Sequence, residues 1–331
     1  MLKIIKPAFR NILAVSNSFL AETISPFCAF LYDWCFSYNF ASVKRKQQTE
    51  KKVNMKKIIS LALAAMTAIT VSAQQAEFKT LSGDGFTLHV YNSNDVMADA
   101  SYIVETKDGL VTLEEPLFKT GVADFHAYAE KLGKPVKARI VDYHEGGTGT
   151  SPIIQPEGMP KFMHEGVYAA MMEGFKKGFG DKMVDLPTGN AEEVRFGTAK
   201  TIGGVGYHFV NGPKNDFPAA GILIGKSFYL MHWAPAKAHM NALQLANREA
   251  VTQALEGLKT AKSYKAKHYL GAHGGAATPS DLDFQIGYLS KIELLLAKNN
   301  NAASFVNALK AAYPNLPGEE GLDALAANLY K

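Results

Sequence analysis

Three histidines occupy positions from which their side chains can reach a binding or catalytic site. His144 opens a glycine-rich segment, His273 lies between two pairs of small residues that include glycines, and His232 ends an apolar run that begins at Phe228. Imidazole nitrogens bind zinc and iron, and they also make hydrogen bonds within loops. These residues therefore predict either a metal site or a set of hydrogen-bonding loop residues.

Two other kinds of catalytic motif are not supported by the sequence. The glycines between positions 203 and 206 precede a predicted strand and not a helix, which favours a bend over a phosphate-binding loop. Ser151 lacks the Gly-x-Ser-x-Gly pattern in which serine hydrolases present their nucleophile. We therefore assign no catalytic residue from the sequence.

The elements that must position the histidines alternate along the chain. Alternating or apolar runs predict strands at 86–91, 100–105, 110–113, 138–142, 194–196, 207–210, 220–224, 227–231 and 264–270. Helical patterns lie at 120–132, 165–178 and 236–258, with further helices towards the end of the chain. Strands followed by helix, twice in succession, predict two sheets packed face to face with helices outside.

This order of elements resembles the metallo-β-lactamase superfamily, an α/β fold with an αββα sandwich of two mixed β-sheets flanked by helices. The resemblance covers roughly residues 84–295. It is carried by a hairpin at 107–113, a strand that runs into the segment 144–149, the run 228–232 and the segment 271–275.

The family's first metal loop reads His-x-His-x-Asp-His, and the matching segment departs from it. Only the second histidine is present, as His144. Asp142 stands at the first histidine, while Gly146 and Gly147 replace the Asp-His pair. Since glycine has no ligand atom, the resemblance implies a degenerate site that does not hold two zinc ions in the usual way.

The resemblance also places the other candidates. His273 matches the family's last histidine, and His232 stands where the bridging aspartate is expected. The implied candidate pocket consists of Asp142, Tyr143, His144, Glu145, His232, Trp233 and His273. If a metal is bound, the implied ligands are Asp142, His144, His232 and His273.

Two functions follow from this altered site. In the first, which the two missing ligand positions favour, no metal is bound and the fold is repurposed to bind a small molecule. In the second, one zinc or iron ion occupies a rearranged mononuclear centre and the chain is a metal-dependent hydrolase. In both, the expected partner is a small-molecule ligand or substrate.

Residues 55–73 have the three parts of a secretory signal peptide. Met55 is followed by two lysines, an apolar run over 58–71 and a small-x-small site that ends at Ala73. We therefore expect cleavage after Ala73, a periplasmic or secreted protein, and one domain over 74–331. Because a signal peptide acts at an N-terminus, residues 1–54 are expected to be a non-native upstream extension; the alternative is an N-terminal membrane-active extension.

The charge and cysteine content support this division. The whole chain has a net charge of +4, but residues 1–73 hold 10 of the 35 basic and 3 of the 31 acidic residues, which leaves −3 for residues 74–331. This balance predicts no nucleic-acid partner, and the short apolar run predicts no stable membrane anchor in the mature chain. Both cysteines precede residue 74, so the domain is expected to fold without disulfides.

Overall fold

The computed structural model describes residues 76–95, 97–145, 149–185, 191–211 and 219–331, and the predicted signal peptide and upstream extension lie outside these residues. The described strands form two mixed sheets, and the larger one has seven strands in chain order. These are β1 (Glu77–Ser82), β2 (Thr87–Asn92), β3 (Ala100–Glu105), β4 (Leu110–Glu115), β5 (Val136–Glu145), β6 (Ile153–Pro156) and β7 (Ala191–Val194). The strands β1 to β4 pair antiparallel, and β4 to β7 pair parallel.

The second sheet has six strands in the order β13-β12-β11-β10-β9-β8. Its members are β8 (Ala199–Ile202), β9 (Val205–Asn211), β10 (Ala220–Ile224), β11 (Phe228–Trp233), β12 (His268–His273) and β13 (Gly275–Ala277). All neighbours pair antiparallel except β11 and β12, which are parallel. This parallel pair brings the carboxyl ends of β11 and β12 to the same edge of the sheet.

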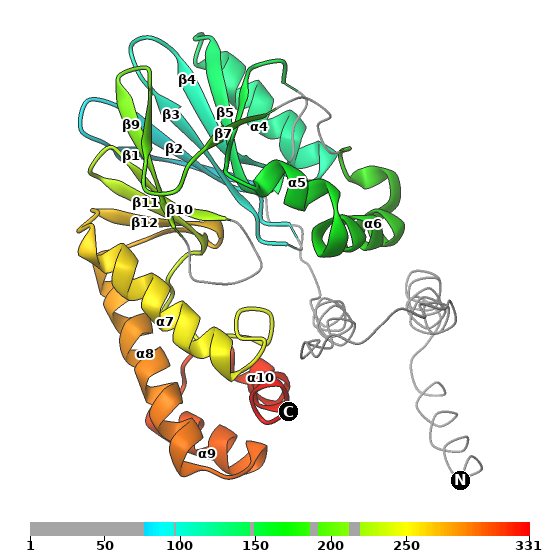
Figure 1. Cartoon of the computed structure of the whole chain (residues 1–331), viewed down its shortest axis with the longest axis vertical. Coiled ribbons are helices and arrows are strands. Elements are labelled where there is room, and N and C mark those ends of the chain that lie inside the picture. The colour runs from blue at the N-terminus through cyan, green and yellow to red at the C-terminus, as the bar shows by residue number, and fades with distance from the viewer. Residues whose placement is uncertain (1–75, 96, 146–148, 186–190, 212–218) are drawn as a thin grey trace, which may run out of the picture. The chain divides into compact units, whose positions relative to one another are not determined.

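The two sheets face each other (Figure 1), and an apolar core lies between them. Leu88 and Val104 of the first sheet and Phe209 and Leu230 of the second belong to one cluster of buried side chains. Alternate residues of each strand point inward, which is the pattern of a sandwich. The predicted αββα sandwich is therefore confirmed.

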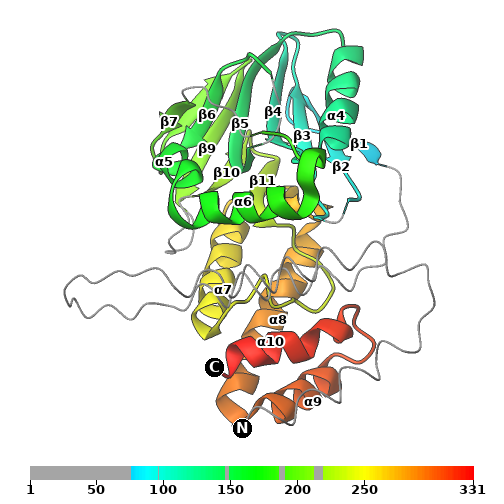
Figure 2. The ribbon, with the colours of Figure 1, turned by 90° about the vertical axis from the view of Figure 1, so that its right-hand side faces the viewer.

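Helices cover the outer face of each sheet (Figures 1 and 2). On the first sheet, Phe125 and Ala129 of α4 pack against Tyr91 and Ile103. The helices of the first half are α4 (Lys119–Lys131), α5 (Met159–His164) and α6 (Gly166–Phe179), followed by the 3-10 turn η1 (Gly180–Lys182). Those of the second half are α7 (Arg248–Ser263), α8 (Pro279–Lys298), α9 (Ala302–Ala312) and α10 (Leu322–Leu329), with the 3-10 turn η2 (Glu319–Gly321) before α10.

Some predicted boundaries were wrong for identifiable reasons. The helix expected at 236–258 begins only at Arg248, because the side chain of Asn247 accepts the N–H of Ala250 and caps it there. The strand expected at 264–270 begins at His268, since Lys265 has a positive φ of 54° that no strand adopts. In addition, β5 continues to Glu145, so the loop expected from position 144 starts later.

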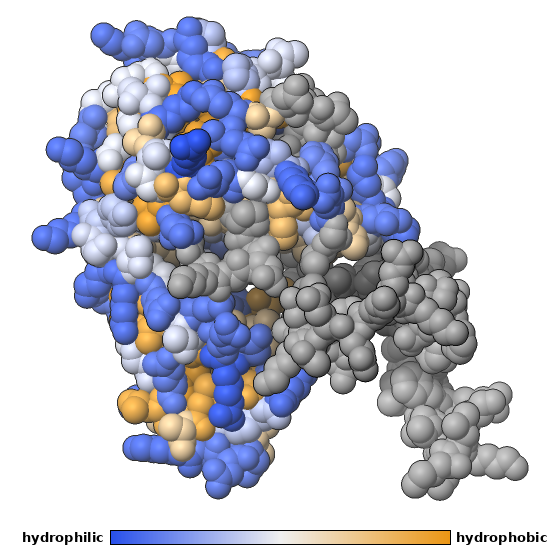
Figure 3. Space-filling model, in the orientation of Figure 1, coloured by the Kyte–Doolittle hydropathy of each residue, from blue (hydrophilic) through white to orange (hydrophobic). Residues whose placement is uncertain are grey.

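Large apolar side chains are mostly covered among the described residues. No helix among them is long and apolar enough to cross a membrane. The face drawn in Figure 3 is mainly hydrophilic, with apolar patches between the charged side chains. Leu294 is the one large apolar side chain that is strongly exposed among the described residues, at 55%.

Candidate metal centre

The end of β5 is fixed in place by the carboxylate of Glu114. Glu114 has a positive φ of 56° at a shift in the β4–β5 register, so a bulge there re-aims its side chain. The carboxylate accepts the backbone N–H groups of Asp142 at 2.9 Å, Tyr143 at 3.0 Å and His144 at 2.9 Å. Hydrogen bonds from three consecutive backbone N–H groups thus hold the segment of β5 that carries His144.

The other two histidines lie at the ends of the parallel pair β11 and β12. His232 is on β11, and the next residue, Trp233, is paired with His273 on β12. The chain is close-packed at this point: a Cβ atom added to Gly271 would lie 2.0 Å from the backbone nitrogen of Ala234. Glycine at 271 is therefore required for the two strand ends to approach each other.

Tyr102 ties the first sheet to the strand that carries His273. Its hydroxyl oxygen lies 2.6 Å from the carbonyl oxygen of Gly271 and 3.0 Å from that of Gly275, and it accepts the N–H of Gly271 at 3.1 Å. The side chain is fully buried. This bridge fixes β12 relative to β3, and hence His273 relative to the sheet of His144.

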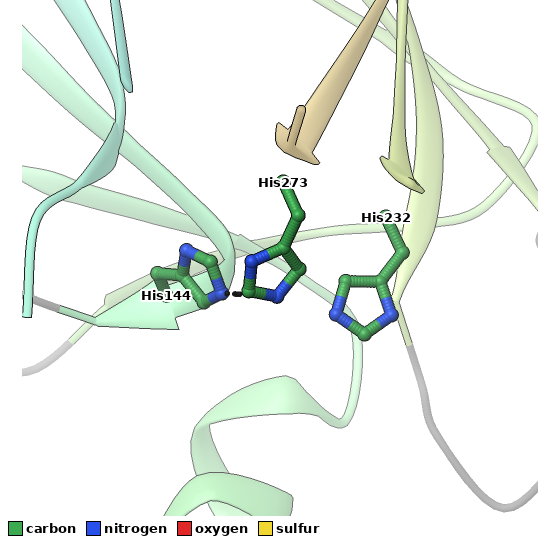
Figure 4. A group of neighbouring side chains, drawn as sticks. All are labelled: His144, His232 and His273. Carbon is green, nitrogen blue, oxygen red and sulfur yellow. Dashed lines mark hydrogen bonds between the residues drawn. The ribbon is translucent and has the colours of Figure 1, made fainter. Parts of the chain in front are cut away.

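Figure 4 shows the rings of His144, His232 and His273 close together although they come from three strands of two sheets. The Nε2 atoms of His144 and His273 are 3.2 Å apart. One ring nitrogen from each of the three residues lies within 4.8 Å of the other two. His144 and His273 are buried, and His232 is partly exposed.

Burial favours the neutral form of His144 and of His232. It lowers the pKa of His144 to about 4, although nearby Asp99 acts in the opposite direction. Burial also lowers the pKa of His232 well below its ordinary value, and the neighbouring imidazoles of His273 and His144 add to this effect. Neutral rings have the free lone pair that a metal ligand needs.

The donor set fits a single ion. The Nδ1 atom of His273 is 2.9 Å from the carbonyl oxygen of Met97, and a carbonyl can only accept, so Nδ1 carries the proton and Nε2 offers its lone pair. Two nitrogens bound to one tetrahedral zinc ion, at about 2.0–2.1 Å each, lie about 3.3 Å apart. The separation of the Nε2 atoms of His144 and His273, 3.2 Å, is close to this value.

Two aromatic side chains stack on the histidine rings. Tyr143 lies parallel to His232, with ring centroids 4.4 Å apart and an interplanar angle of 3°. Trp233 stacks on His273 at 4.3 Å and 24°. Stacking restricts rotation of the imidazoles, so the predicted pocket residues Tyr143 and Trp233 orient the candidate ligands.

Asp142 does not belong to the histidine cluster. Its side chain is fully buried, and Oδ1 accepts the N–H of Ala220 at 2.9 Å, which links β5 to β10 of the other sheet. Burial and the neighbouring Glu114 raise its pKa well above the ordinary value. Three of the four candidate ligands therefore meet, and Asp142 connects the two sheets instead.

The remaining candidates lie partly outside the described residues. Glu145 is the last residue of β5, and only its backbone is described. Gly146 and Gly147, which replace the family's Asp-His pair, are outside the described residues. Their positions relative to the histidines stay a prediction.

Sequence reasoning missed two acidic residues at this site, Glu114 and Asp99. Both are fully or almost fully buried, and Asp99 contacts the rings of His144 and His273. The two consecutive glutamates that end β4 were a possible signal, because buried strands seldom carry charge without a partner. Asp99 gave no signal of this kind, since it stands as a single acidic residue before the strand that begins at Ala100.

Comparison with known proteins yields structures but no family model and no curated protein that matches this chain. A β-lactamase domain protein from Burkholderia ambifaria is similar, with 14% identity over 80% of this chain and 88% of its own and a TM-score of 0.48. A metallo-β-lactamase family protein from Thermus thermophilus is similar too, with 13% identity, 78% and 92% coverage and a TM-score of 0.47.

A flavo di-iron protein variant from Thermotoga maritima is also similar, at 13% identity, 76% and 77% coverage and a TM-score of 0.46. Similarity at this level says nothing about the metal, the substrate or the activity of this chain. The sheet order and the layers described above show the architecture directly. The chain has a metallo-β-lactamase-like αββα fold, with a histidine cluster that can bind a metal where its two sheets meet.

Proposed function

We propose that this chain is a metal-dependent hydrolase with a single ion bound by His144, His232 and His273. The observation that supports this most strongly is the convergence of three imidazoles, with one nitrogen of each within 4.8 Å of the others. Catalytic zinc sites often use three protein ligands and keep a fourth position open. When bound, zinc or iron supplies Lewis-acid activation for hydrolysis at neutral pH.

The protein's own residues have three tasks in this proposal. The backbone N–H of His144 is held by Glu114 and the ring of His273 by the carbonyl of Met97, which reduces the cost of arranging the two residues for an ion. His144 and His232, whose pKa values burial lowers, bind an ion without first releasing a proton. His232 is the partly exposed ligand, so a substrate is expected to approach from its side, along Tyr143 and Trp233.

The location and the substrate class belong to the same proposal. The signal peptide predicted at 55–73 implies export, so the reaction would take place in the periplasm or outside the cell. A centre with one ion and a few aromatic residues suits a small molecule better than a polymer. The altered metal loop argues against the zinc-dependent hydrolysis of β-lactams.

Metal analysis of the purified full chain tests the proposal. We expect about one zinc or iron per chain, removal by a chelator, and restoration by stoichiometric metal. The variant His273→Phe keeps an aromatic ring at 273 but should retain little metal. His268→Phe, on the same strand β12 and outside the cluster, is the matched control and should retain metal like the wild type.

Fluorescence provides a second measurement. Of the chain's two tryptophans, only Trp233, which stacks on His273, lies in the expected mature domain 74–331, so its emission reports on the site. Cobalt added to the metal-free protein should quench its emission and saturate at one equivalent. Metal-dependent hydrolysis of simple nitrophenyl esters would then extend the result from binding to activity.

Two results would contradict the proposal. Two ions per chain would contradict a mononuclear centre. Absence of metal after purification and after reconstitution would contradict the hydrolase and favour the other prediction from the sequence, a protein that binds a small molecule without metal. That function has no supporting contact of its own among the described residues.

A further inference from the structure

A buried histidine outside the candidate metal centre holds a long connecting segment in place. Residues 234–247 join β11 to α7 and contain no helix or strand. His239 lies near the middle of this segment, and 6% of its surface is exposed. Its Nδ1 atom lies 2.9 Å from the hydroxyl oxygen of Tyr288 on α8. The ring of His239 therefore attaches the segment to α8.

The same residue also joins the segment to the residues before α10. The N–H of His239 donates to the carbonyl oxygen of Pro317 at 2.7 Å. The next residue, Gly318, has a positive φ of 93°, and a Cβ atom added there would lie 3.1 Å from the carbonyl oxygen of His239. The amide of Asn328 donates to the carbonyl oxygen of Ala242 at 3.0 Å. His239 thus belongs to a close-packed contact between residues 234–247 and residues 317–328.

The ring of His239 has one hydrogen-bond partner within the described residues. Its Nε2 atom is buried and has none there. The titratable groups around the ring come from α8, from α9 and from the residues that follow α9, and they are Tyr288, Lys310, Tyr313, Glu319 and Glu320. The carboxylate of Glu319 is paired with Lys310 at 3.5 Å and not with the ring.

These surroundings oppose a proton on the ring. Burial lowers the pKa of His239 below its ordinary value, although Glu319 and Glu320 act in the opposite direction. An imidazolium ring carries a proton on both nitrogens, so it needs two acceptors, while this ring has only the hydroxyl of Tyr288 beside it. A buried cation with an unpaired N–H group is costly. A protonated ring is therefore expected to leave its place for water.

We propose that His239 is a pH-sensitive latch, which holds residues 234–247 on α8 while its ring is neutral and releases them when the ring is protonated. The segment begins directly after Trp233, and its first residue, Ala234, donates its N–H to the carbonyl oxygen of His273 at 2.9 Å. Release would therefore increase the mobility of the chain beside the candidate metal centre. This role needs no bound metal and is separate from the proposed function.

Hydrogen exchange of the metal-free full chain, followed by mass spectrometry and corrected for intrinsic rates, tests the latch between about pH 7.5 and about pH 5. Because the pKa of His239 is lowered in the closed state, the open state takes up the proton more readily, and opening becomes more favourable as the pH falls. Protection of residues 234–247 should fall by up to about tenfold for each pH unit below about 6.5. Protection of β3 in the sandwich should stay constant.

Two variants assign the effect to one ring. In His239→Gln, the side chain cannot take up a proton, but its amide can still form a hydrogen bond with Tyr288. Protection of residues 234–247 in this variant should not depend on pH. His164→Gln is the matched control, because His164 is exposed at the end of α5, and this variant should respond to pH like the wild type.

The wild type alone can overturn the latch. Equal protection of residues 234–247 at both pH values would do so, even if His239→Gln fails to fold. A loss of protection in acid that persists in folded His239→Gln would assign the release to another group. An equal loss of protection in β3 would show that acid unfolds the sandwich as well, which contradicts a local release.

Discussion

Two buried polar clusters lie along the strands β4 and β5, and they differ in how well their groups are partnered. In the first, Arg139 donates to both carboxylate oxygens of Glu115 at 3.0 Å and to the carbonyl of Gly149 at 3.1 Å, while Thr112 donates to Glu115 at 2.8 Å. In the second, the histidine cluster, Nδ1 of His144 has no hydrogen-bond partner within the described residues.

This difference in hydrogen bonding distinguishes a cluster that supports the fold from one that forms a candidate binding site. The side chains of Arg139 and Glu115 are both 2% exposed, so this chain can bury full charges with complete hydrogen bonding. A hollow of about 190 Å³ adjoins this ion pair, but among the described residues that line it no buried side-chain atom is left without a partner. Nδ1 of His144 is one of several buried atoms among the described residues that lack a hydrogen-bond partner, so the histidine cluster is less completely hydrogen-bonded than the ion pair.

The largest predicted effect concerns the partnered cluster. Arg139→Met keeps much of the side-chain volume but leaves Glu115 buried without its counter-ion. Breaking a buried ion pair in this way costs about 3–5 kcal/mol of unfolding free energy. Urea denaturation of the metal-free protein measures the loss.

The same variant should keep its metal. Arg139 lies on β5, but its side chain contacts the Glu115 cluster and not the histidines. Cobalt affinity of the folded variant should therefore equal that of the wild type. A weakened affinity together with unchanged stability would reverse the roles that we assign to the two clusters.

The second prediction concerns the histidine cluster. His144→Phe replaces a ring that has an unpartnered nitrogen by an apolar ring, so the stability of the metal-free protein should change by no more than about 1 kcal/mol. The wild type should gain about 2.7 kcal/mol at a free metal concentration roughly 100-fold above the dissociation constant, and the variant should gain nothing. Thermal unfolding with and without cobalt measures both quantities.

A large loss of stability in metal-free His144→Phe would contradict this. It would show that His144 supports the fold in the way that Arg139 does. The comparison between a structural cluster and a site would then no longer hold.

The sequence predicted the architecture better than the site. Apolar and alternating runs gave most strands, because the inward residues of a sandwich are selected by burial alone. The helix start at Arg248 was missed, since Asn247 had no capping-box partner to mark it as a cap. Local pattern thus predicted which segments form strands, and it was weakest at the ends of elements.

The site depends on contacts that no local pattern contains. The positions of His144, His232 and His273 were suggested by the order of elements, but Asp142 carries a carboxylate of the right chemistry and instead bonds to Ala220 on the other sheet. Asp99 lies far from the histidines in sequence and meets them only through the pairing of its backbone with His273. Side-chain direction and long-range pairing appear only in the folded chain.

The smallest predicted effect is a dependence of stability on pH that comes from the partnered cluster. Burial opposes ionisation of Glu115, but the contact with His126 and the hydrogen bonds from Arg139 and Thr112 outweigh it and hold the pKa of Glu115 below its usual range. A carboxyl group with a lowered pKa contributes stability above its unfolded value, about 4.3, and that contribution is lost as the pH falls through the folded value.

Glu115→Gln removes this contribution. Between about pH 5 and pH 2 the unfolding free energy of the wild type should therefore fall more steeply than that of Glu115→Gln, by at most about 1.4 kcal/mol per pH unit, the limit for one proton. Glu130→Gln, an exposed carboxyl group on α4 beside the same hollow, is the matched control and should keep the slope of the wild type. Equal slopes for the wild type and Glu115→Gln would show that Glu115 is not held ionised by its partners. The Arg139–Glu115 ion pair would then no longer serve as the example of a fully hydrogen-bonded cluster with which the histidine cluster is compared.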